Sequence, residues 1–275
     1  MSAELPSALA GLSLELMLDP GPERLIALVD APRLGRCLAE LLPATPNPRH
    51  ADRHRALLDE DLTALRCLAE HPGLCPIAAL HASPTGELVA LSPISPDATP
   101  LQRCQPNLPK EEVARSSLLA LAALHERGVV HRDLRPTLLF ARPDGRLQLA
   151  GLALAHRAAA VRVKDPAWLD AMMSRRYRAP ELFRNPELCD PRSDLFSLGL
   201  TLRELGTGEP ACSLDPIAIQ RQGRLPEGAS PPEPGASPAL HALLTRLLQL
   251  DPVTRPRSAA ALEASSVWNE KDDER

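Results

Sequence analysis

Residues 131–140, which read His-Arg-Asp-Leu-Arg-Pro-Thr-Leu-Leu-Phe, constrain the fold more than any other stretch of the chain. The run before them reads as a helix that Gly128 closes, because glycine readily adopts the left-handed conformation that ends helices. A short apolar pair, Val129-Val130, separates that glycine from the charged residues. The pattern predicts a loop of titratable side chains after a long helix, with Asp133 as its acidic group.

This loop resembles the catalytic loop of the protein kinase family, which reads H-R-D-L-x-x-x-N. In that family the aspartate accepts the proton of a substrate hydroxyl, and the asparagine holds a magnesium ion. Asp133 matches the aspartate, but Leu138 stands at the asparagine position and has no oxygen that could bind magnesium. The resemblance therefore implies a kinase fold together with a loss of kinase chemistry.

Further segments match the family in its own order. Residues 147–155 resemble the strand and metal-binding turn K-L-x-D-F-G-L-A, and residues 177–181 contain the A-P-E motif. Residues 193–199 resemble the start of the buried large-lobe helix, and residues 250–256 resemble the turn before the final helix. The match is specific in the second part of the chain and rests on spacing in the first.

The resemblance covers about residues 13–268 and implies an α+β fold of two lobes. The small N-lobe is rich in β-strands and has one long helix, and the larger C-lobe is helical. Strands are expected at 12–18, 24–29, 37–42, 77–80 and 88–91, and helices at 53–70 and 109–127. The expected divisions are a frayed start (1–12), the N-lobe (13–91), a hinge (92–100), the C-lobe (101–268) and a polar tail (269–275).

Composition and charge narrow the classes of partner and the cell compartment to expect for the chain. The net charge of −4 gives no reason to expect nucleic acid or an anionic membrane as a partner, and no apolar run approaches the roughly 18 residues of a membrane span. Acidic Glu4 near the start is unlike a secretory leader. The six cysteines form no C-x-x-C pair, as expected of reduced thiols in a cytoplasmic protein. His50 and His54 lack a metal-ligand spacing, so no metal site is expected.

The resemblance places the phosphate-binding positions on unsuitable residues. The glycine-rich loop corresponds to Asp19, Gly21 and Arg24, so Gly21 is a lone remnant and Asp19 would repel phosphate. Glu40 occupies the lysine position, and Asp61 (or Glu60) occupies that of its glutamate partner. Two acids would repel each other or share a proton if they were close, and the expectation is that they point apart into solvent.

The metal and adenine positions are altered as well. Gly151 replaces the metal-binding aspartate at the family's usual spacing from Asp133, so neither Leu138 nor Gly151 offers a side-chain oxygen. Leu38 and Phe140 are larger than the residues that line the adenine pocket and could fill it. Pro93, or a residue one position away, corresponds to the hinge residue whose N–H bonds adenine, and proline has no N–H.

Several matched positions are architectural. Glu181 and Arg255 match a buried ion pair, and Asp194 matches an acid that bonds the backbone of the catalytic loop. His131 matches a core histidine, and Arg135 replaces the loop lysine. Asp133 either remains a base or shapes the loop by bonding Ser174, and the second role is expected. Residues 151–173 contain no Ser, Thr or Tyr, so Arg132 has no phosphorylated partner there.

Residues 165–173 predict a short helix in this segment. Asp165 can cap it, Pro166 suits its first turn, and its apolar stripe consists of Trp168, Leu169, Met172 and Met173. The stripe either packs into the altered cleft of its own domain or forms a candidate interaction surface for a partner.

These features favour a catalytically inactive kinase-like domain, a pseudokinase, that acts as a protein-binding scaffold or allosteric regulator. No cofactor is expected, with weak or no binding of ATP and magnesium, and the partner would be a protein such as an active kinase or a signalling protein. One alternative is a residual kinase or other phosphotransferase that works without metal and uses Asp133 as base. Another is a scaffold that serves only through its fold within a larger assembly.

Overall fold

The computed structural model describes residues 6–20, 24–44, 68, 71–83, 86–103, 109–157, 166–209, 219, 222–225 and 236–263. The long N-lobe helix expected at 53–70 lies outside the described residues except for Leu68, as do Gly21, Glu60 and Asp61. His50, His54 and the polar tail also fall outside them.

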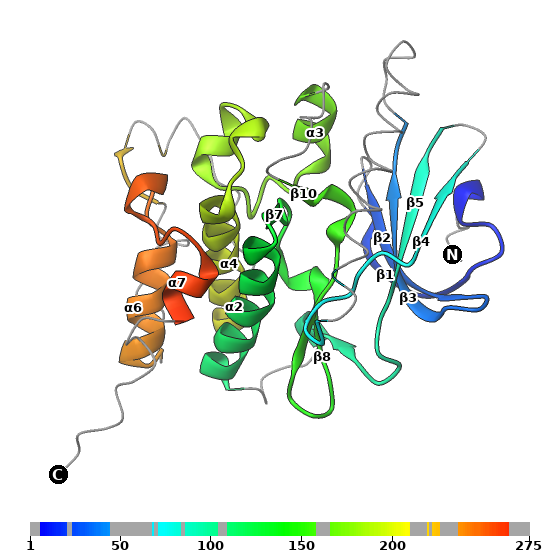
Figure 1. Ribbon diagram of the computed structural model, residues 1–275, viewed down its shortest axis with the longest axis horizontal. Coiled ribbons are helices and arrows are strands. Elements are labelled where there is room, and N and C mark those ends of the chain that lie inside the picture. Colours follow the sequence, from blue (N-terminus) through cyan, green and yellow to red (C-terminus); the bar gives the residue numbers. More distant parts are fainter. Residues whose placement is uncertain are drawn as a thin grey trace.

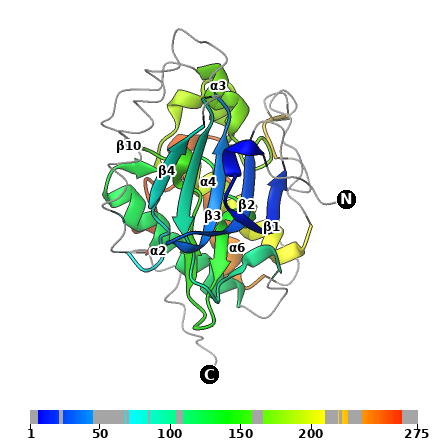
Figure 2. The same ribbon diagram turned by 90° about the vertical axis from the view of Figure 1, so that its right-hand side faces the viewer.

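The first lobe is a five-stranded antiparallel sheet in the order β1-β2-β3-β5-β4. Its strands are β1 (Ser13–Pro20), β2 (Leu25–Ala31), β3 (Gly35–Leu42), β4 (Ala79–Ala82) and β5 (Leu88–Pro93). The central strand β3 is buried on both faces from Cys37 to Leu42, which explains its nearly continuous apolar sequence. Figure 2 looks onto this sheet, with the helices of the other lobe behind it.

The start of the chain corrects one expectation. Ser7–Leu9 form a 3-10 turn, and Leu9 is fully buried in the same apolar cluster as Val29 and Cys37. Residues 6–12 are therefore not frayed, because burial of Leu9 anchors them to the sheet.

The second lobe is mostly helical and stands beside the sheet (Figure 1). Its helices are α2 (Lys110–Glu126), α3 (Pro166–Met172), α4 (Pro191–Thr207), α6 (Pro238–Leu247) and α7 (Ala259–Glu263). Short strands are β6 (Thr99–Pro100), β7 (Val129–Val130), β8 (Leu139–Ala141), β9 (Leu147–Leu149) and β10 (His156–Arg157). Its 3-10 turns are η3 (Leu101–Arg103), η4 (Pro136–Leu138), η5 (Leu152–Leu154), η6 (Pro180–Phe183), η7 (Pro186–Leu188) and η9 (Pro252–Thr254).

Helix α4 forms the centre of this lobe and contacts both α2 and α6. Asp190 caps its first turn by accepting the N–H of Arg192, and Ser193 completes the capping box. A Cβ at Gly199 would lie 2.8 Å from the side chain of Leu248, so glycine permits the close packing beside α6. The expected α+β fold of two lobes is confirmed.

The connection between the lobes is shorter than expected, because β5 continues to Pro93. Arg36 of β3 holds it by donating to the carbonyls of Pro96, at 3.0 Å, and Ala98. The same guanidinium pairs with Glu15 of β1 at 2.7 Å. Within the described part of the chain, no helix is long and apolar enough to cross a bilayer.

Candidate functional site

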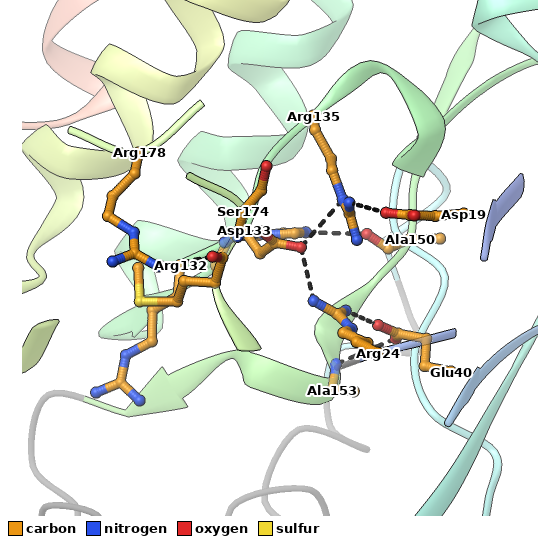
Figure 3. Close-up of polar contacts among 12 residues, drawn as sticks. Asp19, Arg24, Glu40, Arg132, Asp133, Arg135, Ala150, Ala153, Ser174 and Arg178 are labelled. Atoms are coloured by element: carbon orange, nitrogen blue, oxygen red, sulfur yellow. Dashed lines mark hydrogen bonds and ion pairs between the residues drawn. The ribbon is translucent and has the colours of Figure 1, made fainter. Parts of the chain in front are cut away.

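The candidate site lies where the sheet meets the loop after β7 (Figure 3). Arg24, just before β2, donates to Asp133 Oδ2 at 2.6 Å and also bonds Glu40 of β3. All three side chains are buried, at 3% exposure or less. Arg24 therefore bridges two carboxylates that belong to different lobes.

Glu40 corrects the expectation of a solvated acid, since its exposure is 0%. Strand alternation places Glu40 on the same face of the sheet as Leu38, and that face lies against the other lobe. A carboxylate in that position requires a cation and donors, because an unpaired buried charge is very unfavourable. Arg24 provides the cation, and the N–H of Ala153 donates to Glu40 Oε1 at 3.2 Å.

The charge of Arg24 is stabilised despite its burial. Desolvation alone would lower the pKa of Arg24, but the carboxylates of Glu40 and Asp133 outweigh it and raise that pKa. Arg24 therefore stays a cation, and its positive charge is shared by two acids.

A second arginine extends the network. Arg135 pairs with Asp19 of β1, and its Nε lies 3.1 Å from Asp133 Oδ2 without hydrogen-bond geometry. The five side chains alternate in charge in the order Glu40, Arg24, Asp133, Arg135 and Asp19. We call this arrangement the charge chain. It joins the lobes at two ion pairs, Arg24 with Asp133 and Arg135 with Asp19.

Asp133 is fully engaged by these contacts. Its Oδ2 faces the two arginines, and its Oδ1 accepts the backbone N–H of Ser174 at 2.8 Å. The expected contact with Ser174 thus exists but uses the main chain instead of the hydroxyl. With both oxygens occupied and 3% exposure, Asp133 has no free side toward a substrate hydroxyl in this conformation.

The two lost metal positions fit each other instead of a metal. Gly151 has a φ of +85°, and a Cβ there would lie 2.5 Å from Leu138 Cδ1. Leu138 is fully buried and therefore occupies the space that a side chain at position 151 would need. Apolar carbon at both positions does not fit magnesium, which requires oxygen ligands. Among the described residues, no group of three His, Cys, Asp or Glu side chains could hold a metal ion.

Leu38 and Phe140, the residues matched to the adenine pocket, lie in one apolar cluster that we call the apolar plug. Both lobes contribute its members, which are Ile26, Leu28, Leu38, Cys75, Ile94, Ala98, Leu138, Phe140 and Ala150. Pro93 has no N–H, and the N–H of Ile94 donates to the carbonyl of Arg36 at 2.9 Å. The hinge therefore has no backbone N–H at position 93 to bond adenine, and the N–H at position 94 already bonds Arg36.

The catalytic loop keeps its internal supports. Asp194 accepts the N–H groups of His131 at 2.7 Å and Arg132 at 2.9 Å, and it contacts His125 Nε2 at 3.0 Å. These bonds hold Arg132 at a φ of +72°, which is uncommon for a residue with a side chain. His131 is fully buried, and its Nε2 lies 2.9 Å from the carbonyl oxygen of Ala150. The expected bonds from Asp194 to the backbone of the loop are thus present beside Asp133.

The expected ion pair between Glu181 and Arg255 also forms. Arg255 donates to Glu181 through two bonds of 2.7 and 2.8 Å, and its guanidinium lies 4.7 Å from the centre of the Phe196 ring. Ser193 donates to the same carboxylate at 2.9 Å. This bidentate geometry ties η6 to the turn before α7.

For the apolar stripe of helix α3, the structure shows the first of the two alternatives, packing on its own chain. The side chains of Trp168, Leu169, Met172 and Met173 are all buried in the main apolar core. Trp168 Nε1 donates to the carbonyl of Pro43, at the end of β3, at 3.2 Å. The stripe therefore packs on its own chain, and the bond of Trp168 links α3 to the first lobe.

Sequence reasoning assigned Arg24 only to a lost glycine position and missed its bridging role. The available signal was Glu40 itself, an acid in a strand flanked on both sides by apolar residues. Such an acid requires a cation, and the arginines near the start of the chain were candidates.

Known proteins are similar to this chain in sequence. A family model described as protein kinase domain matches residues 102–267. Serine/threonine-protein kinase 16 of Mus musculus is 32% identical over 151 residues, covering 50% of this chain and 48% of that protein. Serine/threonine-protein kinase PknL of Mycobacterium tuberculosis is 32% identical over 155 residues, covering 55% and 38%. Serine/threonine-protein kinase PknB of Mycolicibacterium smegmatis is 28% identical over 160 residues, covering 57% and 25%. The matched part is therefore about half or less of each relative.

Proposed function

The chain belongs to the protein kinase family, and from that premise we propose that it is a catalytically inactive member. It would act as a protein-binding scaffold or allosteric regulator, with weak or no binding of ATP and magnesium. The observation that carries the proposal is the bridge from Arg24 to Glu40 and Asp133.

Phosphoryl transfer relies on positioning and on positive charge around the phosphates. Here the cation nearest to the family's base is Arg24, and two protein carboxylates already neutralise it. Asp19 would add repulsion for a phosphate group. The charge chain therefore takes the place of the interactions that a nucleotide and its metal make in active relatives.

Opening the cleft would be costly. A ligand at the adenine position would have to displace the apolar plug, whose members Leu38, Leu138 and Phe140 are fully buried. It would also separate buried ion pairs, and leaving one buried charge without its partner costs about 3–5 kcal/mol. These two costs together support weak or absent nucleotide binding.

A closed cleft leaves binding through the outer surface as the function. We propose a protein partner, such as an active kinase or another signalling protein. The thiols of Cys37 and Cys75 are free and buried, which supports a reducing, cytoplasmic environment for this binding domain.

The second candidate is a residual phosphotransferase that uses Asp133 as base without metal. It is favoured by the preserved bonds of Asp194 to the catalytic loop and by the ion pair between Glu181 and Arg255. Such an enzyme would need the charge chain to open, so that Asp133 could reach a substrate hydroxyl.

Transfer of labelled phosphate from ATP separates the two candidates. The intact chain is incubated with labelled ATP, magnesium or manganese, and a general protein substrate, beside a matched Asp133→Asn variant. Inactivity predicts equal background for both proteins. Incorporation that the intact chain shows and Asp133→Asn lacks would overturn the proposal and favour the residual enzyme.

A further inference from the structure

Three exposed arginines occur close together in the chain between α3 and α4: Arg175, Arg176 and Arg184. None of them forms an ion pair with any acid among the described residues. Leu188, in the same stretch, is 53% exposed and so offers an apolar side chain beside these arginines. We call these four residues the arginine surface.

Three of the acids near this surface are already committed elsewhere. Asp170 pairs with Arg178 at 2.5 Å, and Glu181 pairs with Arg255 at 2.7 Å. Asp190 accepts the N–H of Arg192 at the start of α4. The positive charge of the arginine surface is therefore not balanced by these three acids.

Buried side chains of the same stretch hold the backbone that carries the arginine surface. The Tyr177 hydroxyl donates to Glu204 of α4 at 2.5 Å, and the guanidinium of Arg178 lies 5.1 Å from the centre of the Phe183 ring. Turn η7 contacts both α3 and η6. Buried side chains thus fix the stretch, while Arg175, Arg176 and Arg184 are exposed.

The electrostatics around Arg178 agree with excess positive charge. Burial lowers the pKa of Arg178, and the nearby charge of Arg175 lowers it further, although Asp170 acts in the opposite direction. A bound anion would relieve this crowding of cations.

We propose that the arginine surface binds an acidic protein segment that carries an apolar side chain, which would rest on Leu188. This inference deepens the proposed function, since it names the chemistry of the partner and depends on the domain's being a binding module. A protein segment is favoured over nucleic acid because the chain as a whole has a net charge of −4, which opposes binding to a polyanion beyond one local surface.

Fluorescence anisotropy of a short labelled peptide made of glutamate, aspartate and leucine tests the proposal. The peptide should bind the intact chain, and the affinity should fall as salt is raised, because exposed charges are screened. Arg175→Glu/Arg176→Glu/Arg184→Glu should weaken binding about tenfold or more, while Leu188→Ser should weaken it less.

A matched control changes the net charge equally at three other exposed arginines, in Arg33→Glu/Arg103→Glu/Arg146→Glu. Arg146 immediately precedes β9, and Arg103 ends η3, which contacts β8. In Figure 1, β8 lies toward the opposite edge from α3. This control should bind the acidic peptide within about twofold of the intact chain. Melting temperatures of both triple variants check that the fold is intact.

Three results would each overturn the proposed role of the arginine surface. They are no binding of the peptide, equal loss of affinity in both triple variants, and tighter binding of a single-stranded oligonucleotide than of the peptide. None of these outcomes touches the proposed inactivity, which fails only if phosphate is transferred. Conversely, an active enzyme that binds the peptide through these arginines would contradict the proposed function and leave the surface intact.

Discussion

Leu138 fills the space beside Gly151, so that a Cβ at position 151 would lie only 2.5 Å from Leu138 Cδ1. These are the two positions at which active relatives hold magnesium. Each replacement therefore depends on the other: the leucine needs a neighbour without a side chain, and the glycine would leave a void without the leucine.

Gly151→Ala tests this dependence. It should destabilise the chain by about 2–4 kcal/mol, because it combines backbone strain at positive φ with overpacking against Leu138. In denaturant unfolding, Leu138→Ala/Gly151→Ala should lose clearly less than the sum of the two single variants, because the methyl group partly fills the void. Gly145→Ala is the matched control: its φ is +79° but a Cβ there meets no atom within 4 Å, so only the strain remains. Strict additivity of the two changes would contradict the packing.

Arg24→Met tests the charge chain. The variant should lose about 3–5 kcal/mol of unfolding free energy, because Glu40 and Asp133 would remain buried without their shared cation. Arg33→Met, at an exposed arginine near the same sheet, should change stability by less than about 0.5 kcal/mol. Equal midpoints for Arg24→Met and the intact chain would show that Arg24 does not bridge the two acids in solution.

Arg255→Ala addresses the ion pair with Glu181. Removal of the guanidinium leaves a largely buried carboxylate with one hydroxyl donor, Ser193, and should cost about 3–5 kcal/mol. The double variant Arg255→Leu/Glu181→Leu removes both charges and should be milder. If the double variant were less stable than Arg255→Ala, desolvation of the unpaired carboxylate would not be the cause.

Two buried thiols predict how stability depends on alkaline pH. Burial raises the pKa of Cys37 to about 11 and that of Cys75 to about 12. Because both pKa values are higher in the folded state, the unfolded state releases these protons first as the pH passes the ordinary value of 9.0. The free energy of unfolding should be fully retained below pH 9. Above it, each thiol should lower that free energy by about 1.4 kcal/mol per pH unit, until the pH reaches the pKa of the same thiol in the folded state.

Cys37→Ala should remove part of this slope between about pH 9 and 11, which unfolding at a series of pH values would measure. Cys189→Ala is not a suitable control, since burial raises the pKa of that thiol too. The intact chain in the range of pH 7 to 8 provides the baseline instead. An unchanged slope in Cys37→Ala would mean that this thiol ionises equally in both states.

The fold was predictable because local motifs in the second lobe are individually specific. The spacing of His131, Asp194 and Arg255 along the chain placed the loop, the α4 start and the ion pair correctly. Sequence alone could not predict the partner of Glu40, because Arg24 and Glu40 meet only once β2 pairs with β3 and the sheet packs against the loop that carries Asp133. It also left two alternatives for Trp168, since an apolar stripe shows which face is buried but not what covers it.

The same limitation explains the error at the start of the chain. Leu9 stands in a short segment without a clear period, and only the completed sheet provides the surface on which it packs. Periodicity predicts elements that are amphipathic over several turns or strand residues, and it has little to say about single anchoring side chains.

Calorimetric titration with ATP and magnesium measures whether the cleft, filled by the chain's own side chains, still admits a nucleotide. The filled cleft should give no saturable heat below millimolar ATP. At about millimolar ATP with a Kd of several millimolar, the gain in stability should be only a few tenths of a kcal/mol. Saturable binding at submillimolar ATP that requires magnesium would contradict a filled cleft.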